Sequence, residues 1–297
     1  MTVDLAVVPV AGHGTRLLPT TKAQPKEMLP VGRKPVVQYV VEELAASGIE
    51  RVLFITGAGK ASIENHFDED QALIQYLRET CREEELAELD FERQNVQFFY
   101  TRQRQQLGLG HAVLCARPLV GNQPFSVALG DSIIGLHANS TIMRRMLDEF
   151  DRSGADIVVA LQEVPPQDVR KYGVIDPLGP VTGERIELKG VIEKPLPEEA
   201  PSRLAFVGRY VFSPRIFDEL AQTKPGRGGE IQLTDAIQRV LAQGGKGVGL
   251  RLLPHERRFD IGNFSSYFKA FFEFAISDPK YGAALKAHAK ALLESQP

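Results

Sequence analysis

The sequence has few cysteines and no excess of positive charge. Only two of its 297 residues are cysteines, Cys81 and Cys115, and neither has the spacing of a metal ligand. This excludes a disulfide framework and favours two free thiols in a reducing compartment. The formal net charge is −3 at pH 7, so bulk electrostatic binding to nucleic acid or to an anionic membrane is not expected. Any anion-binding surface must therefore be a local cluster of charge.

Long apolar runs are absent too. The chain has no stretch of about 18 apolar residues, as a membrane-spanning helix requires, and no signal-peptide pattern at its start. Its composition, 43% apolar and 25% charged, is that of a globular protein, and its length is ample for a sizeable core. We therefore predict a cytoplasmic protein with no membrane and no nucleic acid among its partners.

Two common nucleotide-binding motifs are incomplete. Residues 12–17 begin like the dinucleotide fingerprint but lack its third glycine, and residues 57–62 lack it as well. The second segment also fails as a P-loop, because Ala61 follows Lys60 where serine or threonine is required. No convincing Ser/His/Asp or Cys/His constellation is found. Hydride transfer, P-loop hydrolysis and nucleophilic catalysis by a side chain are all disfavoured.

What the chain does have is a cationic glycine turn behind a buried strand. The apolar run 5–10 leads into Gly12 and Gly14, and Arg16, Lys22 and Lys26 follow in quick succession. Glycines let backbone N–H groups approach an anion closely, and arginine and lysine add full positive charge. The pattern predicts binding of a polyphosphate.

Strand-like and helix-like stretches alternate along the chain, which predicts an α/β fold with a mostly parallel sheet and helices on both faces. In such sheets ligands bind at the carboxyl ends of the strands, so residues 12–16 and Asp131 should share one cleft. The predicted strands are 5–10, 51–56, 96–100, 125–129, 156–161 and 206–212, and the predicted helices are 36–47, 62–66, 110–116, 142–150 and 278–295.

Two further regions have patterns of their own. Between residues 68 and 94, apolar residues at helical spacing predict amphipathic helices that cover the domain or meet another subunit. From residue 172 to 203, short runs broken by proline and glycine predict β-hairpins and loops, which form a second lobe over the cleft.

Two aspartates are candidate metal ligands. Asp131 ends a buried strand, where a carboxylate is costly unless it is paired, hydrogen-bonded or bound to a cation. Magnesium favours one or two carboxylates plus phosphate oxygens, which suits a metal–nucleotide site. Asp260 lies between an apolar residue and a glycine turn and is the second candidate. A helix cap or an ordinary loop aspartate is the alternative for Asp131.

Other polar residues suit a phosphate, a sugar and a base. Lys194 follows a short apolar run and suits a second phosphate, and Glu193 can accept hydrogen bonds from hydroxyls; a solvated charge pair is the alternative. Gln103 can pair with a base edge, and Gly108 allows a flat ring to lie against backbone. His111 is interpreted as a helix-start or packing residue rather than a base.

Together these residues resemble the bacterial UTP–glucose-1-phosphate uridylyltransferases, or UDP-glucose pyrophosphorylases. Gly-x-Gly-Thr-Arg alone indicates only sugar nucleotidyltransferases. Three longer segments narrow the resemblance to the UTP–glucose-1-phosphate uridylyltransferases. They are Pro-Lys-Glu-Met-Leu-Pro at 25–30, Glu-Asn-His-Phe-Asp at 64–68 and Glu-Ile-Gln-Leu-Thr-Asp-Ala at 230–236. The other matching segments are 12–16, 18–19, 21–22, 34–35, 38–40, 102–103, 108–112, 130–131, 172–174, 193–195 and 207–210.

The resemblance implies a Rossmann-like nucleotidyltransferase fold with a mixed, mostly parallel central sheet flanked by helices and a smaller β-rich sugar-binding lobe. It implies one domain over 1–297, with a nucleotide-binding part at about 1–170, a sugar-binding part at about 171–264 and C-terminal helices at about 265–297. It also implies magnesium as cofactor, UTP and glucose 1-phosphate as substrates, and a homodimer or homotetramer.

The resemblance also carries roles for individual residues. The catalytic cations would be Arg16 and Lys26 on the triphosphate and Lys194 on the phosphate of glucose 1-phosphate. Magnesium would be bound by Asp131 and Asp260. The nucleotide would be held by Ala11, Gly12, Gly14, Thr15, Glu27, Gln103 and Gly108, and the glucose by Gly173, Glu193 and Val207.

Two positions depart from the family pattern, and two other functions stay open. His13 stands where relatives have an apolar residue, and Ile261 where many have cysteine. The nearest alternative is the same fold acting on dTTP or on another sugar 1-phosphate. The other is a catalytically silent regulatory paralogue, which the retained Arg16, Lys26 and Asp131 disfavour.

Overall fold

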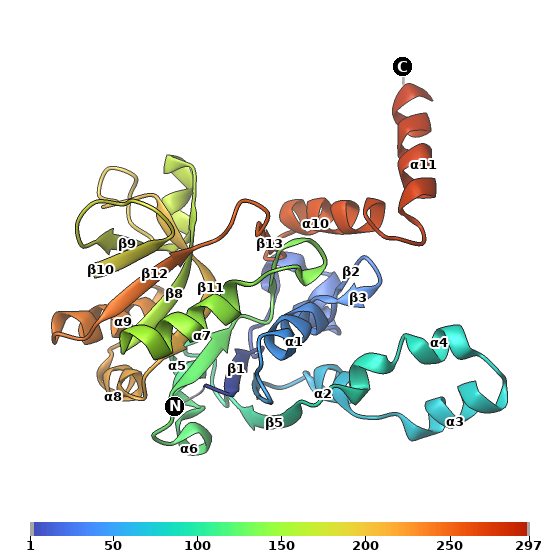
Figure 1. Ribbon diagram of the computed structural model, residues 1–297, viewed down its shortest axis with the longest axis horizontal. Helices are drawn as coiled ribbons and strands as arrows, with labels where there is room; N and C mark the ends of the chain where they lie inside the picture. The colour runs from blue at the N-terminus through green and yellow to red at the C-terminus, as the bar shows by residue number, and fades with distance from the viewer. Residues whose placement is uncertain (1–2, 296–297) are drawn as a thin grey trace.

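A mixed sheet forms the centre of the molecule (Figure 1). Its strands are β1 (Leu5–Pro9), β4 (Arg51–Thr56), β5 (Gln97–Arg102), β6 (Phe125–Ala128), β8 (Ile157–Glu163), β9 (Gly173–Pro177), β10 (Arg185–Glu193), β11 (Leu204–Phe212) and β12 (Gly247–Arg251). In the computed structural model, which describes residues 3–295, these nine strands run in the order β5-β4-β1-β6-β11-β8-β12-β10-β9.

Parallel and antiparallel strands occupy different parts of the sheet. β5, β4, β1 and β6 pair in parallel, as do β8 and β12. β11 runs antiparallel between β6 and β8, and β9 and β10 form an antiparallel hairpin at one end. The mixed sheet and the hairpin are as predicted, and the antiparallel share is larger than the alternating pattern indicated. Because β11 inserts between strands of the predicted nucleotide part, the two parts share one sheet, and their division stays a prediction.

Side chains of the central strands alternate between two cores. Leu5 and Val7 of β1 lie in one hydrophobic cluster, and Ala6 and Val8 lie in the other. Helices cover both faces, as predicted. The first cluster is covered by α5 (Leu109–Leu114), α8 (Arg215–Gln222) and α9 (Leu233–Ala242), and the second by α1 (Val36–Ala46), α2 (Ala61–Phe67) and α7 (Ile142–Ser153).

Short strands and the C-terminal helices build a third cluster beside the sheet. β13 (Arg258–Asp260) pairs antiparallel with β7 (Ser132–Ile134), and α10 (Phe264–Ile276) packs on β13 and on β2 (Pro30–Val31), which pairs with β3 (Lys34–Pro35). The last helix, α11 (Gly282–Ser295), begins later than predicted, because the Asp278 carboxylate accepts from the backbone N–H groups of Lys280 and Tyr281 and forms a turn.

Helices α3 (Gln71–Glu79) and α4 (Glu83–Ala87) form an arm beyond the sheet edge at β5 (Figure 1). These are the predicted amphipathic helices, but they pack on each other and project from the sheet rather than cover it. The Glu84 carboxylate accepts from Lys280 at 3.0 Å, which ties the arm to the C-terminal helices. Contact with another subunit stays a prediction. None of the helices within residues 3–295 has both the length and the apolarity needed to cross a membrane.

Candidate active site

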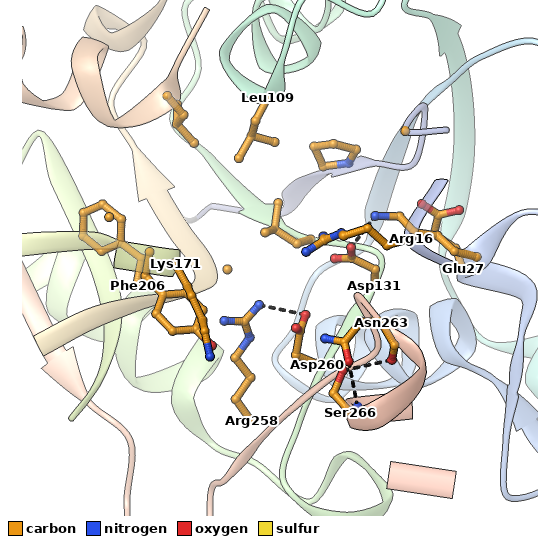
Figure 2. Close-up of a pocket in the computed structure, with 18 of the residues that line it drawn as sticks. Arg16, Glu27, Leu109, Asp131, Lys171, Phe206, Arg258, Asp260, Asn263 and Ser266 are labelled. Atoms are coloured by element: carbon orange, nitrogen blue, oxygen red, sulfur yellow. Dashed lines mark hydrogen bonds and ion pairs between the residues drawn. The ribbon is translucent and has the colours of Figure 1, made fainter. Parts of the chain in front are cut away.

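A cleft of about 1230 Å³ lies along the carboxyl ends of the parallel strands and beside the hairpin (Figure 2). Ala11 and Gly12 follow β1, Gln103 follows β5 and Asp131 follows β6, so three segments distant in sequence meet at one edge. The predicted site residues that line this cleft are Ala11, Gly12, Arg16, Lys26, Glu27, Gln103, Gly108, Asp131, Gly173, Glu193, Lys194 and Asp260.

Gly14 and Thr15 shape the phosphate turn and are not among the residues that line the cleft. Gly14 has φ +68°, a left-handed conformation that favours glycine. Its carbonyl oxygen accepts from Thr21 Oγ1 at 2.7 Å and from the Leu17 N–H at 3.0 Å. These bonds turn the chain so that Arg16 lines the cleft, which makes the contribution of Gly14 a structural one.

Lys26 and Asp131 form a half-buried ion pair in the cleft. Lys26 Nζ lies 2.5 Å from Asp131 Oδ2, and each side chain is less than a fifth exposed, at 17% and 18%. Burial alone would lower the pKa of Lys26, but the carboxylates of Asp131 and Glu27 together outweigh burial and the pKa is raised. Burial likewise acts to raise the pKa of Asp131, but Lys26, assisted by Arg258, lowers it. Both groups are therefore charged at neutral pH.

The β7–β13 ribbon brings Asp260 to the same place. Asp260 pairs with Ser132, the residue after Asp131, and the Ile261 N–H donates to the Asp131 carbonyl at 3.4 Å. Arg258 Nη2 donates to Asp260 Oδ1 at 3.1 Å (Figure 2). Two carboxylates thus line a cleft that also holds the cations Arg16, Lys26 and Arg258. This donor set fits magnesium, which binds through one or two carboxylates together with phosphate oxygens.

Glu193 and Lys194 lie at the end of the hairpin. Glu193 Oε2 accepts from Thr234 Oγ1 at 2.7 Å, and its Oε1 lies 2.9 Å from Lys194 Nζ. Lys194 has φ +48°, and its backbone N–H donates to the Tyr172 carbonyl at 2.9 Å. A left-handed conformation is strained for lysine, and such strain is found at functional sites. Glu193 and Lys194 thus form a charge pair that Thr234 and the Tyr172 carbonyl hold in place, and its role in binding stays a prediction.

Two other predicted sugar-site residues differ in their position. A Cβ on Gly173 would lie 2.7 Å from a ring carbon of Phe206, so only glycine fits where the hairpin meets β11. Val207 is fully buried in the core cluster that α1 and α7 cover, whereas its neighbours Phe206 and Gly208 line the cleft. The expectation that Val207 lines the sugar pocket is therefore not met by its side chain, which points to the opposite face of β11.

Gln103 is oriented by its neighbours. Its Nε2 donates to the Gly108 carbonyl at 3.0 Å and lies 3.0 Å from His111 Nδ1. The amide oxygen is left to accept from an N–H on a base edge. Gly108 has φ +95°, and a Cβ there would lie 2.7 Å from Glu230 Cβ, so glycine is required for both reasons. His111, interpreted from sequence as a packing residue, fixes the Gln103 amide.

Glu27 is paired with Lys60, for which no role was predicted from the sequence. Its carboxylate is 1% exposed, and Lys60 Nζ donates to Glu27 Oε2 at 2.9 Å. Burial raises the pKa of Glu27, against the attraction of Lys26 and Lys60. Lys60 comes from the segment 57–62 that failed as a P-loop. It supports the wall of the cleft from behind.

Known proteins resemble this chain over nearly its full length. Residues 5–275 match the nucleotidyl transferase family. The UTP–glucose-1-phosphate uridylyltransferase YngB of Bacillus subtilis is 45% identical over 291 residues, which are 98% of this chain and 96% of that protein. The chain belongs to the UTP–glucose-1-phosphate uridylyltransferases.

Solved structures of this uridylyltransferase family have the same fold. A UTP-bound enzyme from Acinetobacter baumannii has a TM-score of 0.87 and 37% identity, covering 99% of this chain and all (100%) of that one. A UDP-glucose pyrophosphorylase complexed with UDP-glucose has a TM-score of 0.82 and 36% identity, covering 92% and 98%. The predicted nucleotidyltransferase fold and the predicted enzyme class are confirmed.

The uridylyltransferase cleft also contains residues that the sequence analysis did not single out, including Gln106, Tyr172 and Arg258. Gln106 has Nε2 3.5 Å from the Ala11 carbonyl, close to the predicted uracil site. The position of Arg258, two residues before Asp260, was the only sequence signal that it lies near the site. Strand β13, which carries both residues, was not predicted. The sequence departs from the family pattern at His13 and Ile261. Ile261 is fully buried in the apolar cluster around Phe259, which accounts for an apolar residue there. Nothing in the structure explains His13.

Proposed function

We propose that this uridylyltransferase transfers the uridylyl group of UTP to α-D-glucose 1-phosphate, giving UDP-glucose and pyrophosphate. One observation supports this most directly: the carboxylates of Asp131 and Asp260 line the same cleft as the phosphate turn and Lys194. A cleft with two cationic regions and a pair of carboxylates suits two anionic substrates that share a metal ion.

The reaction requires no general base. An oxygen of glucose 1-phosphate, already an anion, attacks the α-phosphorus of UTP. The bond from that phosphorus to the oxygen bridging toward the β-phosphorus breaks, and pyrophosphate leaves with the electron pair. The obstacle is repulsion between the two anions, so catalysis rests on positioning and on fixed positive charge.

Each end of the cleft binds one reactant in this proposal. Arg16 and Lys26 bind the triphosphate, and the Gln103 amide with the backbone near Ala11, Gly12 and Gly108 binds uracil.

At the other end, Lys194 binds the phosphate of glucose 1-phosphate, while Glu193 accepts from glucose hydroxyls beside Gly173. Asp131 and Asp260 would hold magnesium, which would supply positive charge to neutralise the phosphates. Lys26, paired with Asp131, lines the same cleft and can hold a phosphate oxygen.

Replacing Lys194 with alanine is expected to lower kcat roughly 10²-fold or more, the scale for one preorganised charge-stabilising donor. We expect KM for glucose 1-phosphate to rise and KM for UTP to stay unchanged. Steady-state kinetics with each substrate varied in turn measures both. Lys189→Ala is the matched control, because Lys189 is exposed on β10 and pairs with Asp176. An effect confined to KM for UTP would contradict the assignment.

Pyrophosphate release tests the substrates themselves. Across a panel of nucleoside triphosphates and sugar 1-phosphates, we expect the highest kcat/KM for UTP with glucose 1-phosphate. A higher value with dTTP would favour the alternative nucleotide, which the Gln103 amide does not exclude. No release with any pair would favour the silent paralogue.

We also infer that the enzyme works in the cytoplasm as a homodimer or homotetramer. Cys81 and Cys115 as free thiols support a reducing compartment. The aromatic rings exposed along α10 support self-association, and they belong to Phe268, Phe271 and Phe272. Light scattering measures the assembly, and a monomer at micromolar concentration would contradict it.

A further inference from the structure

Arg258 lies inside the cleft, between the candidate metal-binding carboxylates of Asp131 and Asp260 and the β9–β10 hairpin. Its side chain is only 11% exposed. Figure 2 shows it between Asp260 on one side and Lys171 and Phe206 on the other. The roles assigned above leave this buried cation without a function.

Three contacts hold the guanidinium. Nε donates to Ser132 Oγ at 2.8 Å, and Nη2 donates to Asp260 Oδ1 at 3.1 Å. Cζ lies 5.2 Å from the centre of the Tyr172 ring, a cation–π distance. Ser132 and Asp260 belong to the β7–β13 ribbon, which carries the candidate metal site. Tyr172 precedes Gly173, at the part of the cleft proposed to bind glucose. Arg258 therefore bridges the two ends of the cleft.

The guanidinium retains capacity to bind an anion. It carries several N–H donors in a planar fork that matches phosphate oxygens, and the two hydrogen bonds above use only part of that fork. Arg258 also repeats the arrangement of Lys26, since each cation is paired with one of the two candidate metal-binding carboxylates. If Asp260 held a metal ion, its carboxylate would neutralise the Arg258 guanidinium less. The guanidinium could then bind a phosphate.

We propose that Arg258 is a phosphate-binding residue that holds the diphosphate bridge of the nucleotide sugar. Ser132, Asp260 and Tyr172 hold its guanidinium in position. The inference rests on the proposed function, because it takes UDP-glucose as the ligand of the cleft. It adds an arginine at the junction of the two phosphate-binding ends, where the new phosphate–phosphate bridge forms.

Calorimetric titration of UDP-glucose and of uridine, each in excess EDTA and in Mg²⁺, tests the proposal. We expect Arg258→Met to weaken UDP-glucose binding roughly 10- to 100-fold, the range for hydrogen bonds to a charged group. Uridine binding should stay unchanged, because uridine has no phosphate. Arg258→Lys should lie between, since lysine keeps the charge without the fork. Arg117→Met is the control, because Arg117 is exposed and pairs with Asp218 on the surface.

Other outcomes would overturn the assignment. Equal UDP-glucose affinity in Arg258→Met would do so, as would a parallel loss of uridine affinity, which indicates a disturbed cleft. A loss of UDP-glucose affinity in Mg²⁺ with the affinity in EDTA intact would also overturn it, because Arg258 would then only position Asp260. If Arg258→Met does not fold, wild-type affinity in Arg258→Lys overturns the proposal. Failure of the wild-type protein to bind UDP-glucose would instead overturn the proposed function.

Discussion

Asp131→Asn is expected to lower kcat on the order of 10³-fold, because it removes a metal-binding charge and disturbs a catalytic cation at once. Asparagine keeps the shape of the side chain but not its charge, so the candidate magnesium site is weakened. In the wild-type protein the Asp131 carboxylate raises the pKa of Lys26 against burial. Without that carboxylate only Glu27 opposes the effect of burial, so the pKa of Lys26 falls and its ammonium loses the partner that positions it for the triphosphate.

Magnesium titration of turnover, together with Mn²⁺ binding measured by electron paramagnetic resonance, separates these two effects. We expect weaker metal binding and a kcat that excess magnesium does not restore. Asp176→Asn is the matched control, since Asp176 pairs with Lys189 outside the cleft. Near-normal turnover of Asp131→Asn at limiting magnesium would refute the metal assignment.

The parts of the cleft that follow parallel strands were predictable from sequence. Ala11, Gln103 and Asp131 each come directly after a strand that an apolar run makes visible. The carboxyl ends of parallel strands meet at one edge, so local patterns were enough to place these residues together. The phosphate turn was visible for the same reason, because its glycines and cations are contiguous in the chain.

The rest of the site depends on pairings with no local signal. β13 has three residues and no periodicity of its own, so the position of Arg258 beside Ser132 arises only when it pairs with β7. The core position of the Val207 side chain was not visible in the sequence, because β11 is apolar on both faces and such a strand does not reveal which residues face a ligand. The left-handed conformation of Lys194 likewise depends on its bond to the Tyr172 carbonyl.

Arg209→Met is expected to lower the free energy of unfolding by about 3–5 kcal/mol, the cost of leaving a buried charge without its partner. Arg209 is fully buried in β11, and its Nη2 donates to Glu43 Oε2 at 2.7 Å and to the Ser132 carbonyl at 2.9 Å. Its Nη1 donates to the Gly208 carbonyl at 3.1 Å. Urea unfolding followed by circular dichroism measures the loss, and a cost below about 1 kcal/mol would contradict a charged buried pair.

The double variant Glu43→Met, Arg209→Met separates stability from function. Replacing both partners with apolar residues removes the uncompensated charge, so most of the lost stability should return. Activity should not return with it, because Arg209 also holds the carbonyls of Ser132, next to Asp131, and of Gly208, which lines the cleft. We expect kcat of the refolded double variant to stay roughly 10-fold below wild type, the scale for losing a support behind a metal ligand. Stability and full activity recovered together would show that the pair stabilises the core without positioning the site.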